Sequence, residues 1–282
     1  MSFMNGFCGQ AIVNGEKIAC TDAAFMWKQP LLFYDHTFGL LDAGGKGISR
    51  YFVRPGTRII EGTINFPLAG AGSGLFDHVK SAGPVDVSIE YNTEKSGEFA
   101  GCRLDNYSLS VSAGGLVEIA AGFIGDGHGY GSGGRGGRGI GAEEAPSPRS
   151  SVSSGCWPGP NLVSWSEVEI DVGSSGAGGD IQGFDLQVSN NCNPIYVEPG
   201  GPGDILDPRE IRVGVQVVSG SISFYGVNIG KYWADEETTR VGFSAGGLDI
   251  QIIAMFEPVN NMGIPGAVVS TMPFVGVGTN FY

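Results

Sequence analysis

Alternation of apolar and polar residues is the feature of this sequence that most restricts its fold. Because successive side chains of a strand point to opposite faces, such alternation is typical of half-buried β-strands. Each run is rich in β-branched and aromatic residues and ends near Gly, Pro or Asn. The runs are Thr57–Phe66, Val85–Asn92, Ser164–Val172, Asp180–Val188 and Val215–Phe224. Helical periodicity is scarce, and its best example is Leu75–Ala82, where Leu75 and Val79 share a face behind a Ser73 cap. The sequence therefore predicts a mainly β protein with one short helix.

A hairpin is expected near the start of the chain. Asn14-Gly15 lies between two alternating runs, Gln10–Val13 and Glu16–Cys20. An Asn-Gly pair supplies the two positive-φ positions that a two-residue type I′ turn requires. The two runs are therefore predicted to pair as antiparallel strands.

A Gly/Ser/Pro-rich segment divides the chain in the middle. From Gly125 to about Gly155 it reads GDGHGYGSGGRGGRGIGAEEAPSPRSSVSSG, which holds too few apolar residues to fold alone. We therefore expect a first domain over residues 1–125, a linker or long surface loop over residues 126–155, and a second domain over residues 156–282.

The two sides of this segment resemble each other. GTRIIEGTINF at 56–66 lies over GVQVVSGSISF at 214–224 without a gap, and both glycines, an Ile and the Phe coincide. SAGGL occurs at 112–116 and again at 244–248, and each copy joins two alternating strands through a Gly-Gly turn. Two matches in the same order favour an internal duplication, so we expect two tandem β domains. The second copy shows no sign of the helix or of the strand that follows it.

Charge and composition exclude several classes of protein. The 282 residues include 16 Lys and Arg, 29 Asp and Glu, and 41% hydrophobic residues, which give a net charge of −13. A low charged fraction with this much apolar content argues against disorder. A surface with this much negative charge repels the phosphate backbone of a nucleic acid. No apolar run approaches the roughly 20 residues of a membrane span. Met1–Gln10 lacks a basic start followed by an apolar core, so neither a membrane span nor a secretion signal is expected.

No motif points to a cofactor or metal site. A G-x-G-x-x-G pattern at 129–134 runs into Arg and Gly instead of the helix that a dinucleotide site needs. The histidines lack metal-ligand spacing, and no G-x-S-x-G presents a nucleophile. The cysteines are odd in number, without a C-x-x-C pair, so they are expected to be buried thiols or cross-links formed after release from the cell. These residues are His36, His78, His128, Cys8, Cys20, Cys102, Cys156 and Cys192.

One run of acidic residues resembles the pair of catalytic carboxylates that sugar hydrolysis uses. Glu167, Glu169 and Asp171 alternate on one face of a single predicted strand. Sugar hydrolysis needs two carboxyl groups across a cleft with separated pKa values, and one strand does not provide them. We interpret the run as a solvated or lumen-facing acidic strand, and we predict no catalytic, cofactor-binding or metal site.

Three stretches of the chain resemble the tail tube proteins of tailed bacteriophages, which have relatives in contractile injection systems. They are YFVRPGTR at 51–58 running into IIEGTINF, DIQGFDLQVSNNCNPIYV at 180–197, and DPREIRVG at 207–214 running into VQVVSGSISF. In the family, a loop like YFVRPGTR or DPREIRVG precedes a long strand of the sheet that lines the tube. The resemblance covers most of residues 10–125 and 160–260.

The resemblance implies a fold and a function. Each domain is expected to be a β-sandwich or half-barrel flanked by a helix. Inner sheets would join around a ring into one β-barrel, which abolishes exposed strand edges, and rings would stack into a hollow tube. An acidic lumen lets DNA pass without sticking. Loops over Phe33–Tyr51 and Pro199–Pro208 would reach the next ring. A duplicated chain supplying two barrel sectors would need three copies per ring, and a chain using one half for the barrel would need six.

The resemblance also implies partners and a location. The chain is expected to bind itself, a tape measure protein in the lumen, tail terminator and baseplate proteins, and a sheath in contractile tails. Double-stranded DNA would pass through without specific binding. The location is the virion tail, assembled in the host cytoplasm. A baseplate hub or a tube-initiating or tube-terminating ring of the same fold is one alternative. A tandem β-sandwich binding module, for instance for carbohydrate, is another, although the absence of a signal peptide and of an aromatic platform counts against it.

The two matched strands carry the candidate assembly residues. They are expected to line the lumen or to pair across subunits. A bulky replacement of Gly62 or Gly220 is expected to spoil assembly and leave a folded monomer. The candidates are Thr57, Ile59, Glu61, Gly62, Thr63, Val215, Val217, Ser219, Gly220 and Ser221.

Overall fold

The computed structural model describes residues 9–28, 31–35, 51–55, 57–69, 73–91, 95–126, 161–173, 180–196, 208–225, 238–257 and 269–277. The strands of the first half are β1 (Gly9–Val13), β2 (Glu16–Ala19), β3 (Asp22–Lys28), β4 (Leu31–Asp35), β5 (Tyr51–Pro55), β6 (Ile59–Pro67), β7 (Pro84–Tyr91), β8 (Lys95–Ser112) and β9 (Glu118–Gly125). Those of the second half are β10 (Glu169–Val172), β11 (Ile181–Ser189), β12 (Asn193–Ile195), β13 (Glu210–Arg212), β14 (Val217–Tyr225), β15 (Thr239–Ala245), β16 (Leu248–Phe256) and β17 (Val269–Gly276). The described helix is α1 (Ser73–Ser81), preceded and followed by strands.

The predicted mainly β class is confirmed, as are the first hairpin and the helix. Asn14 and Gly15 have φ of 48° and 86°, and β1 pairs with β2 across them. Helix α1 ends at Ser81, and the next residue, Ala82, has a φ of 47° in the left-handed region and donates its N–H to the His78 carbonyl at 2.9 Å. Within the described residues no helix is both long and apolar enough to cross a membrane.

Strand β8 connects the two halves of the chain. Its residues Arg103–Ser110 pair with β9 along one edge. Its other edge pairs first with β7, over Lys95–Arg103, and then with β11, over Asn106–Ser112. A β-bulge between Leu104 and Asn106 lies where β7 gives way to β11. The strands of both halves therefore form one 13-stranded sheet.

The second half repeats the strand order of the first. The pairing order β1-β7-β8-β9-β6-β3 in the first half matches β10-β15-β16-β17-β14-β11 in the second. The short ribbon β4–β5 falls between β3 and β6, and β12–β13 falls between β11 and β14. Registers agree as well, since Glu61 pairs with Ile124 as its counterpart Ser219 pairs with Val275. This repeat supports the duplication inferred from the sequence. β15 occupies the place of β7, so the expected absence of the strand after the helix was wrong.

The two sequence matches differ in what they report. GTRIIEGTINF and GVQVVSGSISF contain β6 and β14, which are counterparts. The two SAGGL turns join β8 to β9 and β15 to β16, which are not counterparts in the repeated order. The division into two tandem domains stays a prediction, because β8 and β11 join the halves directly and residues 127–160 lie outside the described residues.

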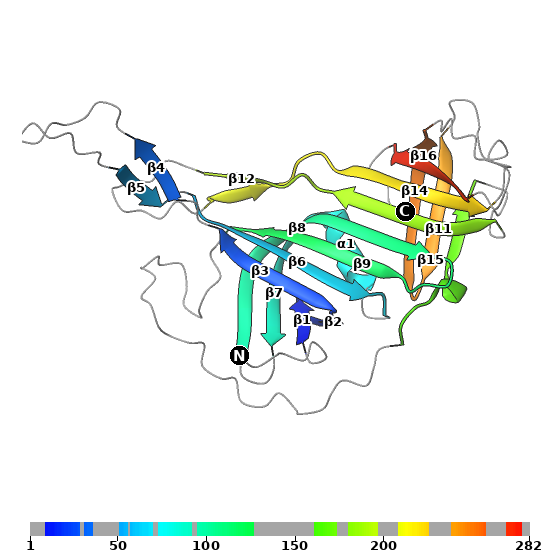
Figure 1. Cartoon of the computed structure of the whole chain (residues 1–282), viewed down its shortest axis with the longest axis horizontal. Coiled ribbons are helices and arrows are strands. Elements are labelled where there is room, and N and C mark those ends of the chain that lie inside the picture. Colours follow the sequence, from blue (N-terminus) through cyan, green and yellow to red (C-terminus); the bar gives the residue numbers. More distant parts are fainter. Residues whose placement is uncertain are drawn as a thin grey trace, which may run out of the picture.

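One connected hydrophobic cluster lies on the inner side of the sheet. In Figure 1, strands β6, β9, β8, β11 and β14 run side by side, with α1 behind them and β15 and β16 crossing steeply at one end. Leu75, Phe76 and Val79 of α1 are almost fully buried in this cluster. Phe184 stacks on Phe243 with ring centroids 5.2 Å apart, so the core includes β11 and β15. Burying this apolar surface leaves the opposite side of the central strands open.

Candidate assembly surface

The outward side of strands β3, β6, β9, β8, β11 and β14 forms a continuous surface that we call the open face. Registers place its residues in rungs that cross both halves without interruption. One rung consists of Asp22, Asn65, Ala120, Ser108, Gln187 and Ser219. The next consists of Ala24, Thr63, Gly122, Asn106, Ser189 and Val217. All of these residues are exposed or half-exposed, whereas their neighbours in sequence along each strand mostly face the core.

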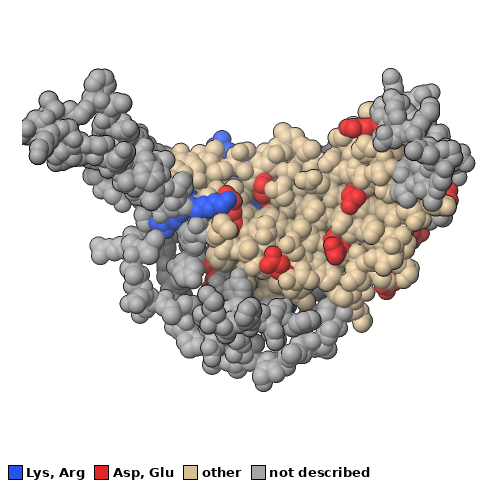
Figure 2. Space-filling model, in the orientation of Figure 1, with Lys and Arg blue, Asp and Glu red and all other residues tan. Residues whose placement is uncertain are grey.

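Small and hydroxyl-bearing side chains dominate the open face. Serine alternates along β8, at Ser108, Ser110 and Ser112, and again along β14. The charges are mostly negative: Asp22, Glu61, Glu118 and Asp185. Lys28 forms an ion pair with Glu61, and both side chains are about half exposed. Figure 2 shows this side of the molecule as mostly uncharged with scattered acidic residues, and basic residues lie toward the end that carries β4 and β5.

The chemistry of the open face is unfavourable for binding nucleic acid. Carboxylates repel a phosphate backbone, and the other side chains are mostly small and hydroxyl-bearing, with Met26 and Val217 as exposed apolar exceptions. Sequence-specific or tight nucleic-acid binding needs clusters of Lys and Arg. Among the described residues the open face carries Lys28, whose charge is offset by Glu61, and Arg103, whose guanidinium donates to the Ala82 carbonyl at 2.6 Å, so no cluster of basic residues forms there.

The predicted assembly residues fall into three groups. Ile59, Glu61, Thr63, Val217, Ser219 and Ser221 lie on the open face. Thr57 and Val215 precede their strands, and Val215 is 78% exposed. Gly62 and Gly220 point to the core side of the sheet. A Cβ on Gly62 would meet the ring of Phe25, and one on Gly220 would meet the Asp185 carbonyl and the Phe274 ring.

The expectation for the two glycines was therefore wrong. A bulky side chain at either position collides with the core and disturbs the monomer before any assembly contact is affected. Residues on β8 and β11 were missed by the sequence reasoning, although NYSLSVS at 106–112 carries a signal. Its serines alternate with Leu109 and Val111, which are buried, so one face had to be polar and small.

The pairing of β8 with β11, together with the polar contacts at its end, forms what we call the internal junction. Asn190 is 1% exposed, and its Nδ2 donates to the carbonyls of Leu104 at 2.8 Å and Val79 at 3.3 Å. Gln216 Nε2 donates to Asn190 Oδ1 at 2.7 Å and to the Val79 carbonyl at 3.1 Å.

The bulge residue Asp105 completes the internal junction. Its carbonyl accepts from the Asn190 N–H at 2.7 Å, and its carboxylate accepts from the Cys192 N–H at 2.6 Å. Buried amides satisfied in this way specify one register, because each would be costly if unpaired. The satisfied buried hydrogen bonds therefore fix how the two halves pair.

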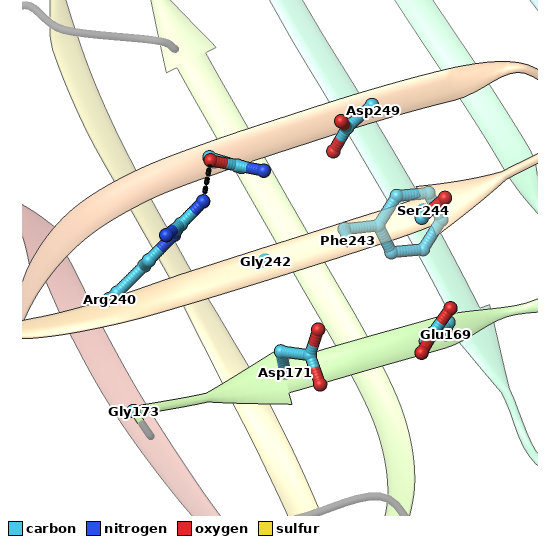
Figure 3. Close-up of a pocket in the computed structure, with 9 residues that line it drawn as sticks. Glu169, Asp171, Gly173, Arg240, Gly242, Phe243, Ser244 and Asp249 are labelled. Atoms are coloured by element: carbon cyan, nitrogen blue, oxygen red, sulfur yellow. Dashed lines mark hydrogen bonds between the residues drawn. The ribbon is translucent and has the colours of Figure 1, made fainter. Parts of the chain in front are cut away.

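A pocket of about 350 Å³ lies on the outer side of β10, β15 and β16. Figure 3 shows Glu169 and Asp171 of β10 on one side and Asp249 of β16 on the other, with Gly242 between them. Arg240 donates a hydrogen bond to Gln251 at the same site. Among the described residues no group of His, Cys, Asp and Glu is arranged to hold a metal ion. Glu169 and Asp171 are exposed, as an acidic strand face requires, whereas Glu167 lies in a 3-10 turn before β10.

Three cysteines lie among the described residues: Cys20, Cys102 and Cys192. Burial raises the pKa of the Cys102 thiol to about 12. Burial, with the nearby Asp105 carboxylate, raises the pKa of Cys192 to about 12. Because the thiolate is the reactive form, these two thiols are inert packing groups and not nucleophiles. Cys8 and Cys156 lie outside the described residues.

A large antiparallel sheet with one packed side and one continuous small, acidic side defines a structural β protein suited to assembly. A family model described as phage tail tube protein matches residues 50–276, and the chain belongs to that family. The match spans both halves and the internal junction. It confirms the resemblance inferred from the sequence and makes the protein a structural component of a bacteriophage tail. No curated protein matches the chain.

Proposed function

We propose that copies of this chain assemble into rings that stack into the hollow tail tube, with the open face lining the lumen. The observation that carries the proposal is the continuity of the open face across both halves, with its small, hydroxyl-bearing and acidic side chains. DNA passing along such a wall meets repulsion and few binding groups. The function is mechanical and involves no catalysis.

The repeated strand order supports three copies per ring. Each half contributes the same three-strand unit to the large sheet, β3-β6-β9 in the first and β11-β14-β17 in the second. A chain with two equivalent units supplies two sectors of the wall, whereas a chain with one unit supplies a single sector. A ring closed by such head-to-tail contacts leaves no sheet edge exposed.

The remaining partners follow from a position in the tube. We propose a tape measure protein in the lumen, terminator and baseplate proteins at the ends, a sheath outside in contractile tails, and assembly in the host cytoplasm. The ribbons β4–β5 and β12–β13 adjoin the segments 33–51 and 199–208, which we propose contact the next ring.

Electron microscopy of the concentrated protein, with its mass measured by light scattering, tests this function. Hollow stacked rings or tubes are the expected result, and the ring mass divided by 29.3 kDa gives the number of copies. Isolated rings that never stack would favour a hub or terminal ring of the same fold. A monomer at every concentration, even with a tube initiator added, would favour a binding module.

A gold label locates the lumen. Ser219→Cys places a thiol on the open face, and the matched control Ser244→Cys places one at the outer pocket. Both variants and the unaltered protein are labelled as monomers with a small gold–maleimide cluster and then assembled. Label along the tube axis for Ser219→Cys and along the outer wall for Ser244→Cys is expected. The reverse arrangement would contradict the assignment of the lumen.

A further inference from the structure

Asn14, in the turn of the β1–β2 hairpin, bonds to two other elements of the first half. Its N–H donates to the Asp86 carbonyl at 2.8 Å, and its Oδ1 accepts from the Asp86 N–H at 2.8 Å. Its Nδ2 lies 3.3 Å from Nε2 of the half-buried His78 in α1. The turn is therefore fixed to β7 on one side and to the helix on the other.

The bond to Asp86 determines which form of His78 fits this arrangement. An amide oxygen accepts hydrogen bonds, and an amide nitrogen donates them. Because Oδ1 of Asn14 faces the Asp86 N–H, the group that faces His78 is the NH₂, and Nε2 has to offer its lone pair. The contact therefore requires a neutral imidazole with its proton on Nδ1.

A second contact joins the same hairpin to the same face of the helix. The Glu16 carboxylate of β2 lies over the first turn of α1, where a Cβ on Gly74 would meet its Oε2. Gly74 and His78 are four residues apart, so they share one face of the helix. The first turn of α1 has no acidic residue of its own, and Glu16 supplies the negative charge that a helix N-terminus favours.

The charges of Glu16 and His78 influence each other. Burial raises the pKa of the Glu16 carboxyl, whereas His78 lowers it and Asp77, beside His78 on the helix, raises it. Lys17 follows Glu16 in β2, so its side chain points to the other face of the strand. Glu16 is therefore the carboxylate of the hairpin that a charged His78 would attract.

Three more charged side chains of the adjoining elements have partners of their own. The Asp86 carboxylate accepts from the Gly101 N–H at 3.1 Å. The Arg103 guanidinium donates to the Ala82 carbonyl at 2.6 Å, beyond the end of the helix. The Lys80 ammonium lies 5.2 Å from the centroid of a phenylalanine ring in its own helix. These contacts leave Glu16 as the partner of opposite charge for His78.

We propose that His78 is an acid-operated switch between the β1–β2 hairpin and α1. When a solvent proton adds to the lone pair of Nε2, the ring presents an N–H to the NH₂ of Asn14, and two donors face each other. The ring then leaves Asn14, and its N–H donates to the Glu16 carboxylate one helical turn away. Histidine is the side chain whose charge ordinarily changes between pH 5 and 8, so the exchange falls in that range.

The switch belongs to the first half of the chain. In the repeated strand order β10 takes the place of β1, and no helix is described between β14 and β15. Mild acid is therefore expected to rearrange the hairpin and helix of the first half and to leave the described part of the second half unchanged. The inference does not depend on the proposed tube.

Nitrogen NMR of the imidazole rings in the full-length monomer tests the switch. At pH 8 His78 is expected as the Nδ1–H tautomer, and the spectrum of His78→Gln identifies its signals among those of the three histidines. As the pH falls to 5, the side-chain NH₂ signals of Asn14 should shift with the same midpoint as the His78 ring. An Nε2–H tautomer at pH 8, or Asn14 signals that do not follow the titration, would overturn the switch.

Two variants separate the two partners of His78. Asn14→Gly tolerates the φ of 48° and removes the amide, so the neutral ring loses its bond and the titration midpoint of His78 should rise by about half a pH unit. Glu16→Gln removes the acceptor of the charged ring, so the midpoint should fall by about the same amount.

The matched control is Asp249→Asn, which removes an exposed carboxylate from the second half and should leave the midpoint of His78 unchanged. Circular dichroism at pH 8 checks that each variant is folded. A contact with a purely structural role would not move the titration, so equal midpoints in Asn14→Gly, Glu16→Gln and wild type would overturn the proposal. If Asn14→Gly does not fold, Glu16→Gln and the tautomer of the wild-type protein still decide it.

Discussion

The two halves of this chain share a strand order and registers but differ at the ends of their sheets. β11 lies between β14 and β8, whereas its counterpart β3 pairs with β6 alone among the described strands. On the second half the outward side of β16 and β17 carries exposed aliphatic residues: Ile253, Met255, Val275 and Val277. The corresponding region of the first half includes Ile124, Arg103 and Asp126. A repeated backbone can therefore carry different exposed side chains in its two halves.

The largest expected effect comes from adding a side chain at the glycine that β6 and β14 share, which is Gly62 in β6 and Gly220 in β14. Gly220→Ala should cost about 3 kcal/mol of unfolding free energy, because its Cβ meets the Asp185 carbonyl, a backbone atom that cannot move aside. Gly62→Ala should cost less, because its Cβ meets the side-chain ring of Phe25. Urea unfolding of the monomer measures both. Gly122→Ala is the control, since its Cβ lies 3.5 Å from that of Asn106. Equal stability of all three variants would contradict the assignment of faces.

The second-largest expected effect comes from removing the buried amide at the internal junction. Asn190→Leu removes the buried amide that bonds Leu104, Val79 and Gln216, and should cost about 2–3 kcal/mol. Asn193→Ala, at an exposed side chain, should change the unfolding free energy by less than about 0.5 kcal/mol. If the unfolding curves of the wild-type protein measured by fluorescence and by circular dichroism coincide, the two halves unfold as one unit. A neutral Asn190→Leu would show that strand pairing alone holds the halves together.

High pH should lower the stability of the folded chain. Cys102 and Cys192 have thiol pKa values raised from 9.0 to about 12 by burial. Above pH 9 the unfolded chain ionises these thiols before the folded chain does, so stability is fully present below pH 9 and is lost as the pH rises toward 12. Unfolding of wild type and Cys102→Ala between pH 8 and pH 11 measures the difference, and the variant should lose less. Parallel curves would show that the Cys102 thiol ionises alike in both states.

A smaller effect concerns the core that both halves share. The Tyr107 hydroxyl is fully buried and has no hydrogen-bond partner among the described residues, and the centroid of its ring lies 5.3 Å from that of Phe76. Tyr107→Phe removes a desolvated polar group and should leave stability unchanged or raise it by about 1 kcal/mol. Thermal unfolding measures it. A clear loss of stability would point to a buried water bonded to the hydroxyl.

The smallest effect concerns the ion pair at the edge of the first half. Glu61→Gln should lower the unfolding free energy by less than about 0.5 kcal/mol, because both partners are about half exposed and water screens their attraction. Comparing unfolding at low and high salt checks this. A loss above 1 kcal/mol that salt does not reduce would show that the pair is more than a surface contact.

Several features could be predicted from local sequence, and one error could have been avoided. Asn14-Gly15 dictates its turn through backbone conformation alone, and the match of 56–66 with 214–224 identifies β6 and β14 correctly. Gly62 alternates with Ile60 and Ile64, so the pattern already placed it on the core side. The prediction for Gly62 relied on the small size of glycine and did not follow this alternation.

The sequence by itself determined the mainly β class, the hairpin, the helix and the family, because alternation and turn residues act over a few neighbouring positions. Only the tertiary structure decided that β8 pairs with β11 and that Asn190 joins the halves. Pairing between strands far apart in the chain depends on which edges remain free after each half has formed its core. The equivalence of the two SAGGL turns failed for the same reason, since similar turns can join different strands.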